Sequence, residues 1–341
     1  MVTTRWRAVL AAVFLMLPGT LPAEVVPRVT LEALTRVHVT EDDAAVRSLG
    51  RGELDLFSTG NRDVRGWMQL RVEDETTVTI PRLEVRWRMP TASGWTPRFT
   101  VGRSRLTWGE GRLFNAGDLI NRARPAEVLG DAPVAATADL REETQWLMAA
   151  YLPLGRFSYI ETVALTESQD TLAAGGRIAG TIGPLKSETG YLYRNEDATH
   201  TIYISASGHM LLDVYGAVSL EIDPALANPA DSSQYTYTGG ALHTATHPRL
   251  GSLSARGELL YTPMVDSLTL FPELIWSPSQ LLALFVRSEI QPGILYAPAG
   301  GVSWTPATGL TLALTATALV GDDLPAPGGG TTIATVVRYR F

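Results

Sequence analysis

The stretch 331–341 restricts the fold more than any other part of the chain, because its apolar residues recur at every second position. One set of alternate positions contains Ile333, Val337, Tyr339 and Phe341, and the other set ends in two arginines. Successive side chains of a β-strand point to opposite faces, so the stretch predicts a strand with one apolar and one polar face. An apolar face that ends in two aromatics, opposite a face that ends in arginines, is typical of a strand between lipid and water.

The same alternation continues through the chain from Val25 onward, in segments separated by clusters of Gly, Pro, Asn, Asp and Ser. Roughly 9–11 residues cross a bilayer in a tilted strand, and the segments are long enough to do so. We therefore expect an all-β fold, a transmembrane antiparallel β-barrel of about 18 strands, with about 16 as the alternative if two segments are hairpins within a loop. The expected strands are 25–39, 45–57, 62–73, 77–89, 97–107, 143–153, 156–167, 171–183, 185–194, 198–207, 210–221, 234–245, 251–262, 267–276, 279–290, 294–304, 308–320 and 331–341.

The expected strand 77–89 contains one irregularity, at Pro81. Proline has no N–H to donate to a neighbouring strand, so a proline inside a strand often marks a β-bulge. We expect a bulge at this position, with Leu83 and Val85 on one face of the strand and the arginines on the other.

The connection 108–142 is by far the longest between two expected strands. If both ends of the barrel lie on the periplasmic side, odd-numbered strands run outward and this connection is the one long extracellular loop. The connections assigned to the other side are all short. Aromatic residues lie beside those short connections and predict a lipid-facing girdle there: Trp87, Trp95, Tyr151, Trp276, Trp304, Tyr339 and Phe341.

The last stretch resembles the closing strand of bacterial outer-membrane β-barrels, in which a terminal Phe preceded by alternating apolar residues is the insertion signal. The resemblance implies that Tyr339 and Phe341 form an assembly signal. It also implies that outer-membrane lipid and the barrel-assembly machinery are partners, and that the protein is located in the outer membrane of a diderm bacterium.

The N-terminus agrees with export. Arg5 and Arg7 precede an apolar run, Ala8 to Leu17, and a small residue follows at Ala23. This order predicts a cleaved signal peptide over 1–23, followed by a single barrel over 24–341. No later stretch is apolar for the roughly 18 residues that a transmembrane helix needs.

The segment 102–121 carries the densest motif of the chain, Gly-Arg-x-Arg-x-x-Trp-Gly-x-Gly followed by Phe-Asn-x-x-Asp-x-x-Asn. It resembles a pattern of porin-like outer-membrane families, which include relatives of the alginate-export barrels. In those families the loop at this position commonly folds into the lumen. We expect loop 108–142 either to fold into the lumen and narrow it or to cover the barrel as an external cap. The residues expected to anchor the loop are Trp108, Gly109, Gly111, Phe114, Asn115 and Asn121.

Arginine is unevenly distributed, since 17 arginines lie between residues 24 and 142. On the inner face they form either a cationic ladder that favours anionic or hydroxyl-rich solutes or a salt-bridge lattice that stiffens the barrel. We expect Ser, Thr, Gly and Ala to line most of the remaining strands. The residues expected to line the pore or its narrowest point are Arg36, Arg51, Arg71, Arg82, Arg86, Arg88, Arg98, Arg103, Arg105, Arg112, Glu84, Glu110 and Asp118.

Other function classes find little support. The net charge of −7 gives no general attraction to nucleic acid, and the absence of cysteine excludes disulfides and thiolate metal sites. The five histidines are scattered, and no nucleophile elbow, metal-binding motif or phosphate loop occurs, so we expect no enzyme, metal or cofactor. The sequence predicts a porin-like channel for passive passage of small polar or anionic solutes. The alternative is a non-conducting structural or surface-interaction barrel.

Overall fold

The computed structural model describes residues 24–40, 44–59, 62–73, 77–91, 94–111, 113–121, 144–166, 171–209, 211–223, 233–321 and 330–341. The predicted signal peptide and residues 122–143 of the long connection lie outside these residues. Within the described residues, no helix has the length and apolar character needed to cross a membrane.

Eighteen β-strands make up nearly all of the described chain, and each of the eighteen predicted segments overlaps one of them. A 3-10 turn (Pro263–Val265) joins two of these strands. The strands are β1 (Glu24–Val39), β2 (Ala44–Thr59), β3 (Val64–Glu73), β4 (Thr77–Arg88), β5 (Arg98–Ser104), β6 (Gln145–Pro153), β7 (Tyr159–Thr166), β8 (Leu172–Ile182), β9 (Leu185–Arg194), β10 (His200–His209), β11 (Asp213–Ile222), β12 (Ser233–His247), β13 (Gly251–Thr262), β14 (Ser267–Ser279), β15 (Leu282–Gln291), β16 (Leu295–Ala307), β17 (Leu310–Leu319) and β18 (Gly330–Arg340).

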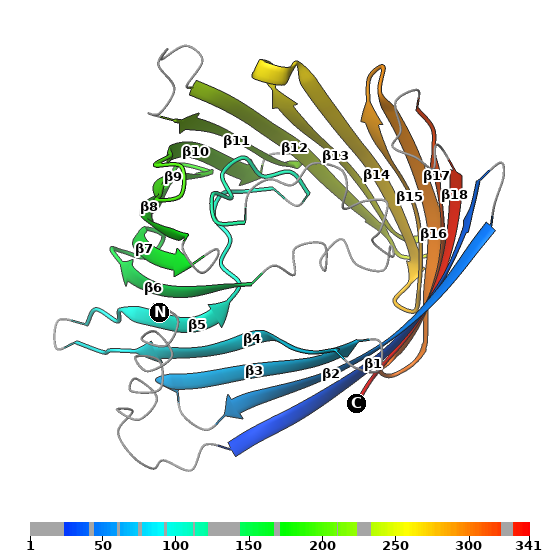
Figure 1. Cartoon of the computed structure of the whole chain (residues 1–341), viewed down its shortest axis with the longest axis horizontal. Coiled ribbons are helices and arrows are strands. Elements are labelled where there is room, and N and C mark those ends of the chain that lie inside the picture. The colour runs from blue at the N-terminus through cyan, green and yellow to red at the C-terminus, as the bar shows by residue number, and fades with distance from the viewer. Residues whose placement is uncertain are drawn as a thin grey trace.

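The strands form one closed antiparallel barrel (Figure 1). Each strand pairs with its neighbours in the sequence, and β1 pairs with β18 to close the ring. Val29 and Phe341 exchange two backbone hydrogen bonds at this closure, with N···O distances of 2.9 and 3.0 Å. The predicted all-β barrel of about 18 strands is therefore confirmed, and the alternative of 16 strands is not.

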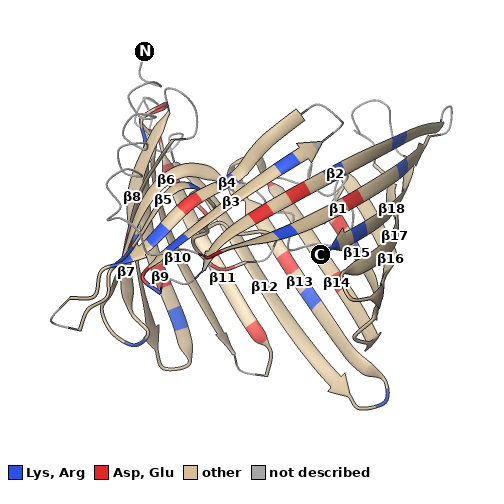
Figure 2. Ribbon diagram, turned by 90° about the horizontal axis from the view of Figure 1, so that it is seen from below, with Lys and Arg blue, Asp and Glu red and all other residues tan. Residues whose placement is uncertain are grey.

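The two faces of the sheet differ as alternation requires. On β13, Leu253 and Leu259 are exposed on the outer face, whereas Arg256 and Glu258 are buried on the inner face. On β18, Ile333 lies outside with the aromatics that end the chain. Figure 2 shows acidic and basic residues interspersed along β1–β4. The apolar outer surface suits lipid, and the charged residues gather on the inside.

The bulge predicted at Pro81 is present in β4. Three residue steps along β4, from Thr79 to Arg82, oppose two steps along β3, from Arg71 to Gln69. The extra residue reverses the side-chain parity of the strand. Val78 therefore points outward on one side of the bulge, and the even-numbered Arg82 points inward on the other side.

The longest connection and the shortest connections lie at opposite ends of the barrel. The connection from β5 to β6 covers 105–144, whereas 183–184 and 308–309 at the opposite end contain two residues each. We call these the long-connection end and the short-connection end. The predicted girdle is wrong at one position: Tyr151 lies directly opposite Glu161, an inner residue, and stacks on Tyr159. Tyr151 therefore faces the lumen and not lipid.

Candidate functional site

The chain enters the ring of strands directly after β5 (Figure 1). We call residues 105–111 and 113–121 the inner segment. Its backbone is folded by its own side chains: Asn115 donates to the Trp108 carbonyl at 2.8 Å and accepts from the Gly117 amide at 3.1 Å, and Asn121 donates to the Leu106 carbonyl at 2.8 Å. Gly109 has a φ of +69°, and a Cβ at this position would lie 2.6 Å from the Asn115 side chain. The fold of the inner segment thus requires glycine there.

A buried apolar cluster holds the inner segment against the wall. Trp108, Leu119 and Ile120 from the segment pack against inward-facing residues of β6–β10. Trp108 is completely buried, and its ring stacks on Tyr203 with 6.2 Å between the centroids. The wall residues of this cluster are Leu147, Val163, Leu165, Ala173, Leu192 and Tyr203.

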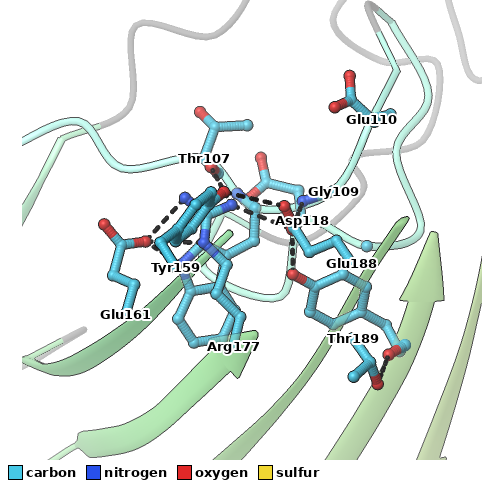
Figure 3. A network of polar contacts seen from close by, with 12 residues as sticks. Thr107, Gly109, Glu110, Asp118, Tyr159, Glu161, Arg177, Glu188 and Thr189 are labelled. Carbon is cyan, nitrogen blue, oxygen red and sulfur yellow. Dashed lines mark hydrogen bonds and ion pairs between the residues drawn. The ribbon is translucent and has the colours of Figure 1, made fainter. Parts of the chain in front are cut away.

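The first anchor is a polar network on β7–β10 around Arg177 (Figure 3). The Arg177 guanidinium lies 2.7 Å from a Glu161 carboxylate oxygen and 3.0 Å from one of Glu188. Glu161 accepts from the Trp108 indole at 3.0 Å, and Glu188 accepts from the Gly109 amide at 2.6 Å and from the Tyr203 hydroxyl. The wall carboxylates therefore bind Arg177 and the inner segment at the same time.

The second anchor lies on β13 and β14. One carboxylate oxygen of Glu258 accepts the Leu113 and Phe114 amides at 2.8 and 2.9 Å. The Phe114 ring packs edge-on against Phe271, with 6.5 Å between the centroids. Beside them Arg256 donates to Glu273 at 2.6 Å.

Two further contacts connect the anchors. The Ala116 amide donates to Thr238 on β12 at 3.1 Å, and Arg194 on β9 donates to the Leu119 carbonyl. All these partners belong to β6–β14, which we call the anchoring wall. Most of the polar groups of the inner segment that these contacts engage are buried, so leaving any of them unpaired would be costly.

The opposite part of the barrel, β18 and β1–β5, carries most of the predicted pore-lining arginines, and we call it the charged wall. Here arginine meets glutamate on neighbouring strands. Arg71 donates to Glu53 at 2.8 Å, and Arg338 donates to Glu32 at 2.6 Å. In β4, Arg82 and Arg86 lie 2.8 and 3.0 Å from the Glu84 carboxylate.

An aromatic pair adds to the charged wall. The Phe57 and Trp67 rings are 4.9 Å apart, and the Arg82 guanidinium carbon lies 3.3 Å from the Trp67 ring centroid. The Trp67 indole also donates to Asp55 at 3.0 Å. Arg82 is thereby fixed against the wall, whereas the Arg86 side chain is 51 % exposed.

The register places most predicted pore residues on the inner face, with one clear exception. Arg103 pairs with Leu83 and Trp146, which point outward, and its guanidinium donates to Thr144 at 3.1 Å. It is therefore not a lumen residue, because an odd-numbered position of β5 faces outward. Arg105 is partly exposed at the start of the inner segment, and Arg112 lies outside the described residues. The predicted residues on the inner face of the charged wall are Arg36, Arg51, Arg71, Arg82, Arg86, Arg88, Arg98 and Glu84.

The two acidic residues expected to oppose these arginines have other partners. Glu110 pairs with Lys186 of β9. Asp118 accepts from the Asn121 side chain at 3.0 Å, within the inner segment. Folding of the segment therefore turns Glu110 toward the anchoring wall and engages Asp118 within the segment itself.

The sequence reasoning named anchor residues within the loop but missed their partners on the wall, because it expected mainly small residues to line the later strands. That expectation is wrong for β7, β9 and β13–β15, and in β8 it fails only at Arg177. A signal was present: in β7 the inward positions Val163 and Leu165 are as apolar as the outward positions Ile160 and Ala164. Apolar residues on both faces of a barrel strand indicate that something packs against the inside.

The donor set does not favour a metal or catalytic site. Among the described residues, no three or more His, Asp or Glu side chains are placed to hold a metal ion. The buried carboxylates of both anchors are occupied by guanidinium groups and backbone amides. The arrangement is suited to holding a segment inside a barrel and to presenting charge along the opposite wall.

No protein-family model and no curated protein matches the sequence. Solved structures do match over nearly the whole chain. OccK2 (OpdF) of Pseudomonas aeruginosa in complex with glucuronate has a TM-score of 0.63 at 9 % identity, and 93 % of this chain and 98 % of that chain are covered. A BenF-like porin from Pseudomonas fluorescens Pf-5 has a TM-score of 0.61 at 9 % identity, with the same coverage of 93 % and 98 %.

An anion-selective porin from Comamonas acidovorans has a TM-score of 0.51 at 12 % identity, covering 94 % of this chain and 100 % of that chain. Such low identities establish the fold alone. The predicted relationship to the alginate-export barrels stays a prediction. The protein has the closed antiparallel β-barrel fold that bacterial outer-membrane porins have.

Proposed function

We propose that this protein is an outer-membrane channel for passive passage of small polar or anionic solutes. The observation that carries the proposal is the one-sided attachment of the inner segment. Its described contacts go to β6–β14, whereas the opposite wall keeps its arginines on the inner face. A barrel of 18 strands is wide enough for an aqueous lumen beside such a segment.

The inner segment narrows this lumen and displaces the path of the solute toward the charged wall. Along that wall the guanidinium groups of residues such as Arg86 face the solute and favour anions. The names of the similar barrels are compatible with this selectivity, since one is an anion-selective porin and another binds glucuronate. Export to the outer membrane through a signal peptide over 1–23 belongs to the same proposal, with lipid and the assembly machinery as partners.

A second candidate function, a non-conducting structural or surface barrel, is favoured by the strength of the attachment. Two buried anchors hold the inner segment, and a fully plugged barrel needs such fixation as much as a narrowed one does. The loop is then a plug and not a constriction.

Conductance in planar bilayers separates the two candidates. The purified barrel should conduct KCl, and excision of residues 110–121 behind a short Gly-Ser bridge should raise the conductance severalfold and admit larger sugars in liposome swelling. If the intact barrel inserts without conducting, it is plugged. If excision leaves conductance and size limit unchanged, the segment does not narrow the path.

A further inference from the structure

Two arginines face each other at the short-connection end of the charged wall. Arg88 ends β4, Arg98 begins β5, and the two residues are directly opposite in the register. In antiparallel pairs such residues have Cβ atoms about 4.5–5.5 Å apart, and like charges there destabilise the sheet. The pair carries an electrostatic cost that an anion between the guanidinium groups would offset.

A neighbouring arginine pair shows how the wall neutralises this cost elsewhere. Arg65 and Arg86 are also directly opposite, but Arg86 lies 3.0 Å from the Glu84 carboxylate. Asp63 is an acidic residue beside Arg88, since its carbonyl accepts the Arg88 amide at 2.7 Å. Among the ion pairs of the described residues, however, none joins Arg88 or Arg98 to an acidic side chain. Glu161, on the far side of Tyr151 from Arg98, is bound to Trp108 and Arg177.

An aromatic stack positions one member of the pair. The Arg98 guanidinium carbon lies 3.9 Å from the Tyr151 ring centroid. Tyr151 in turn stacks on Tyr159, with 4.7 Å between the centroids and 29° between the planes. Arg177 lies over the Tyr159 ring at 5.3 Å, so the stack is continuous with the first anchor.

The geometry of stacking selects the ligand chemistry. A guanidinium that stacks on an aromatic ring covers the π-face of the ring. The five N–H donors of the guanidinium lie in the guanidinium plane, so they remain available at its edge. Arg98 is exposed, so these donors reach the lumen. Two parallel N–H donors match the two oxygens of a carboxylate, which makes a planar carboxylate a better partner than a spherical halide.

We propose that Arg88 and Arg98 form a binding site for the carboxylate group of a small organic acid, with Tyr151 as a positioning residue. The site lies at the short-connection mouth of the lumen. This proposal rests on the proposed channel function, because a solute that follows the charged wall passes this pair as it enters or leaves.

Benzoate tests the site, because its ring protons report binding by NMR line broadening and benzamide is its uncharged isostere. The detergent-purified full-length barrel should broaden benzoate and leave benzamide sharp. The double variant Arg88→Gln/Arg98→Gln should weaken benzoate binding at least about tenfold, since each charge-assisted hydrogen bond contributes substantially. Each single variant should weaken benzoate binding by a smaller factor. If the double variant does not fold, the two single variants replace it as the test.

Control variants separate the site from general charge. Arg156→Gln removes a charge from the β6–β7 connection at the same end and should leave benzoate binding unchanged. Tyr151→Phe keeps the ring and should bind normally, whereas Tyr151→Leu should weaken binding severalfold. Equal loss in Arg156→Gln and in the double variant, or a double variant within twofold of the parent, overturns the proposal.

Competition identifies the anion class. Acetate should displace benzoate at lower concentration than inorganic phosphate does, and the reverse order overturns the assignment to carboxylates. KCl conductance of the same preparations reports the channel function separately. A barrel that conducts without binding benzoate refutes the site, and one that binds benzoate without conducting refutes the channel and leaves the site.

Discussion

The charged wall and the anchoring wall both place arginine against glutamate inside the barrel, but they use the pairing differently. In the anchoring wall the side chains of Glu188 and Arg256 are 1 % and 2 % exposed, because the inner segment covers them. In the charged wall Arg86 and Arg338 remain 51 % and 27 % exposed. The same type of ion pair, arginine with glutamate, therefore fixes the inner segment where it is buried. Where it is exposed, it presents charge to the lumen.

The two walls also differ in how the chain builds them. The anchoring wall, β6–β14, is a run of consecutive hairpins. The charged wall crosses the closure of the barrel, where β18 pairs with β1. Its integrity thus depends on contacts between the two ends of the chain.

The largest effect is expected from deletion of Phe341. Its backbone exchanges two hydrogen bonds with Val29, and its ring is exposed on the outer face beside Tyr339. Each lost interaction contributes about 1 kcal/mol or more, so the amount of assembled barrel should fall about tenfold or more. The amount of assembled barrel is measured in the membrane fraction as the protein whose electrophoretic mobility changes on heating. Phe341→Tyr, which keeps the aromatic ring, should assemble normally, and equal assembly of the deletion variant would refute the role as assembly signal.

The next largest effect is a difference in stability between two variants, each of which neutralises one carboxylate, one in the anchoring wall and one in the charged wall. Glu188→Gln removes one of the two carboxylates that pair with Arg177 beneath the inner segment. Loss of one partner of a buried ion pair lowers the free energy of unfolding by about 3–5 kcal/mol. Glu53→Gln, in the charged wall, should cost about 1–2 kcal/mol, because Glu53 stays partly exposed and holds no loop amide. Urea unfolding in lipid vesicles, followed by Trp fluorescence, measures both.

Conductance adds a second measurement to the same pair of variants. Glu188→Gln releases the Gly109 amide and should raise conductance or its noise, whereas Glu53→Gln should not. Equal losses of stability with equal conductance in the two variants would show that the distinction between the walls is wrong.

The fold could be predicted from the sequence because it depends on local alternation. Most strands show a period of two, and even the bulge at Pro81 follows from the chemistry of proline. The placement of the arginines on the inner face follows from the same period. Arg103 was misplaced because the parity of one short strand decides its side, and that parity depends on the register with Leu83.

The wall partners of the anchors could not be predicted in the same way, since the anchors join residues far apart in the sequence. Glu258 accepts amides from Leu113 and Phe114, which precede it by more than a third of the chain. No local period relates them. Only the inward apolar residues of β7 indicate that a partner lies inside, and they do not identify it.

A smaller effect is expected from Arg86→Gln in the charged wall. Its guanidinium is half exposed to the lumen and its charge is screened by salt over about 8–10 Å, so the anion-to-cation permeability ratio should fall roughly 1.5- to 2-fold. Reversal potentials in a KCl gradient measure it, and Arg249→Gln in the β12–β13 connection is the control. An unchanged ratio with lowered stability would favour the salt-bridge lattice over the cationic ladder.

The smallest effect is expected from Lys186→Gln, which tests whether burial, and not the presence of an ion pair, distinguishes the two walls. Lys186 pairs with Glu110 at the edge of the inner segment, but their side chains are 45 % and 29 % exposed. Exposed pairs contribute about 0–1 kcal/mol, so unfolding and conductance should stay close to those of the parent protein. This pair joins the same wall to the same segment as the first anchor, but it is more exposed than Glu188, which also accepts the Gly109 amide. If Lys186→Gln opened the lumen as much as Glu188→Gln, the segment would be held at its exposed edge, and the buried network around Arg177 would not be its anchor.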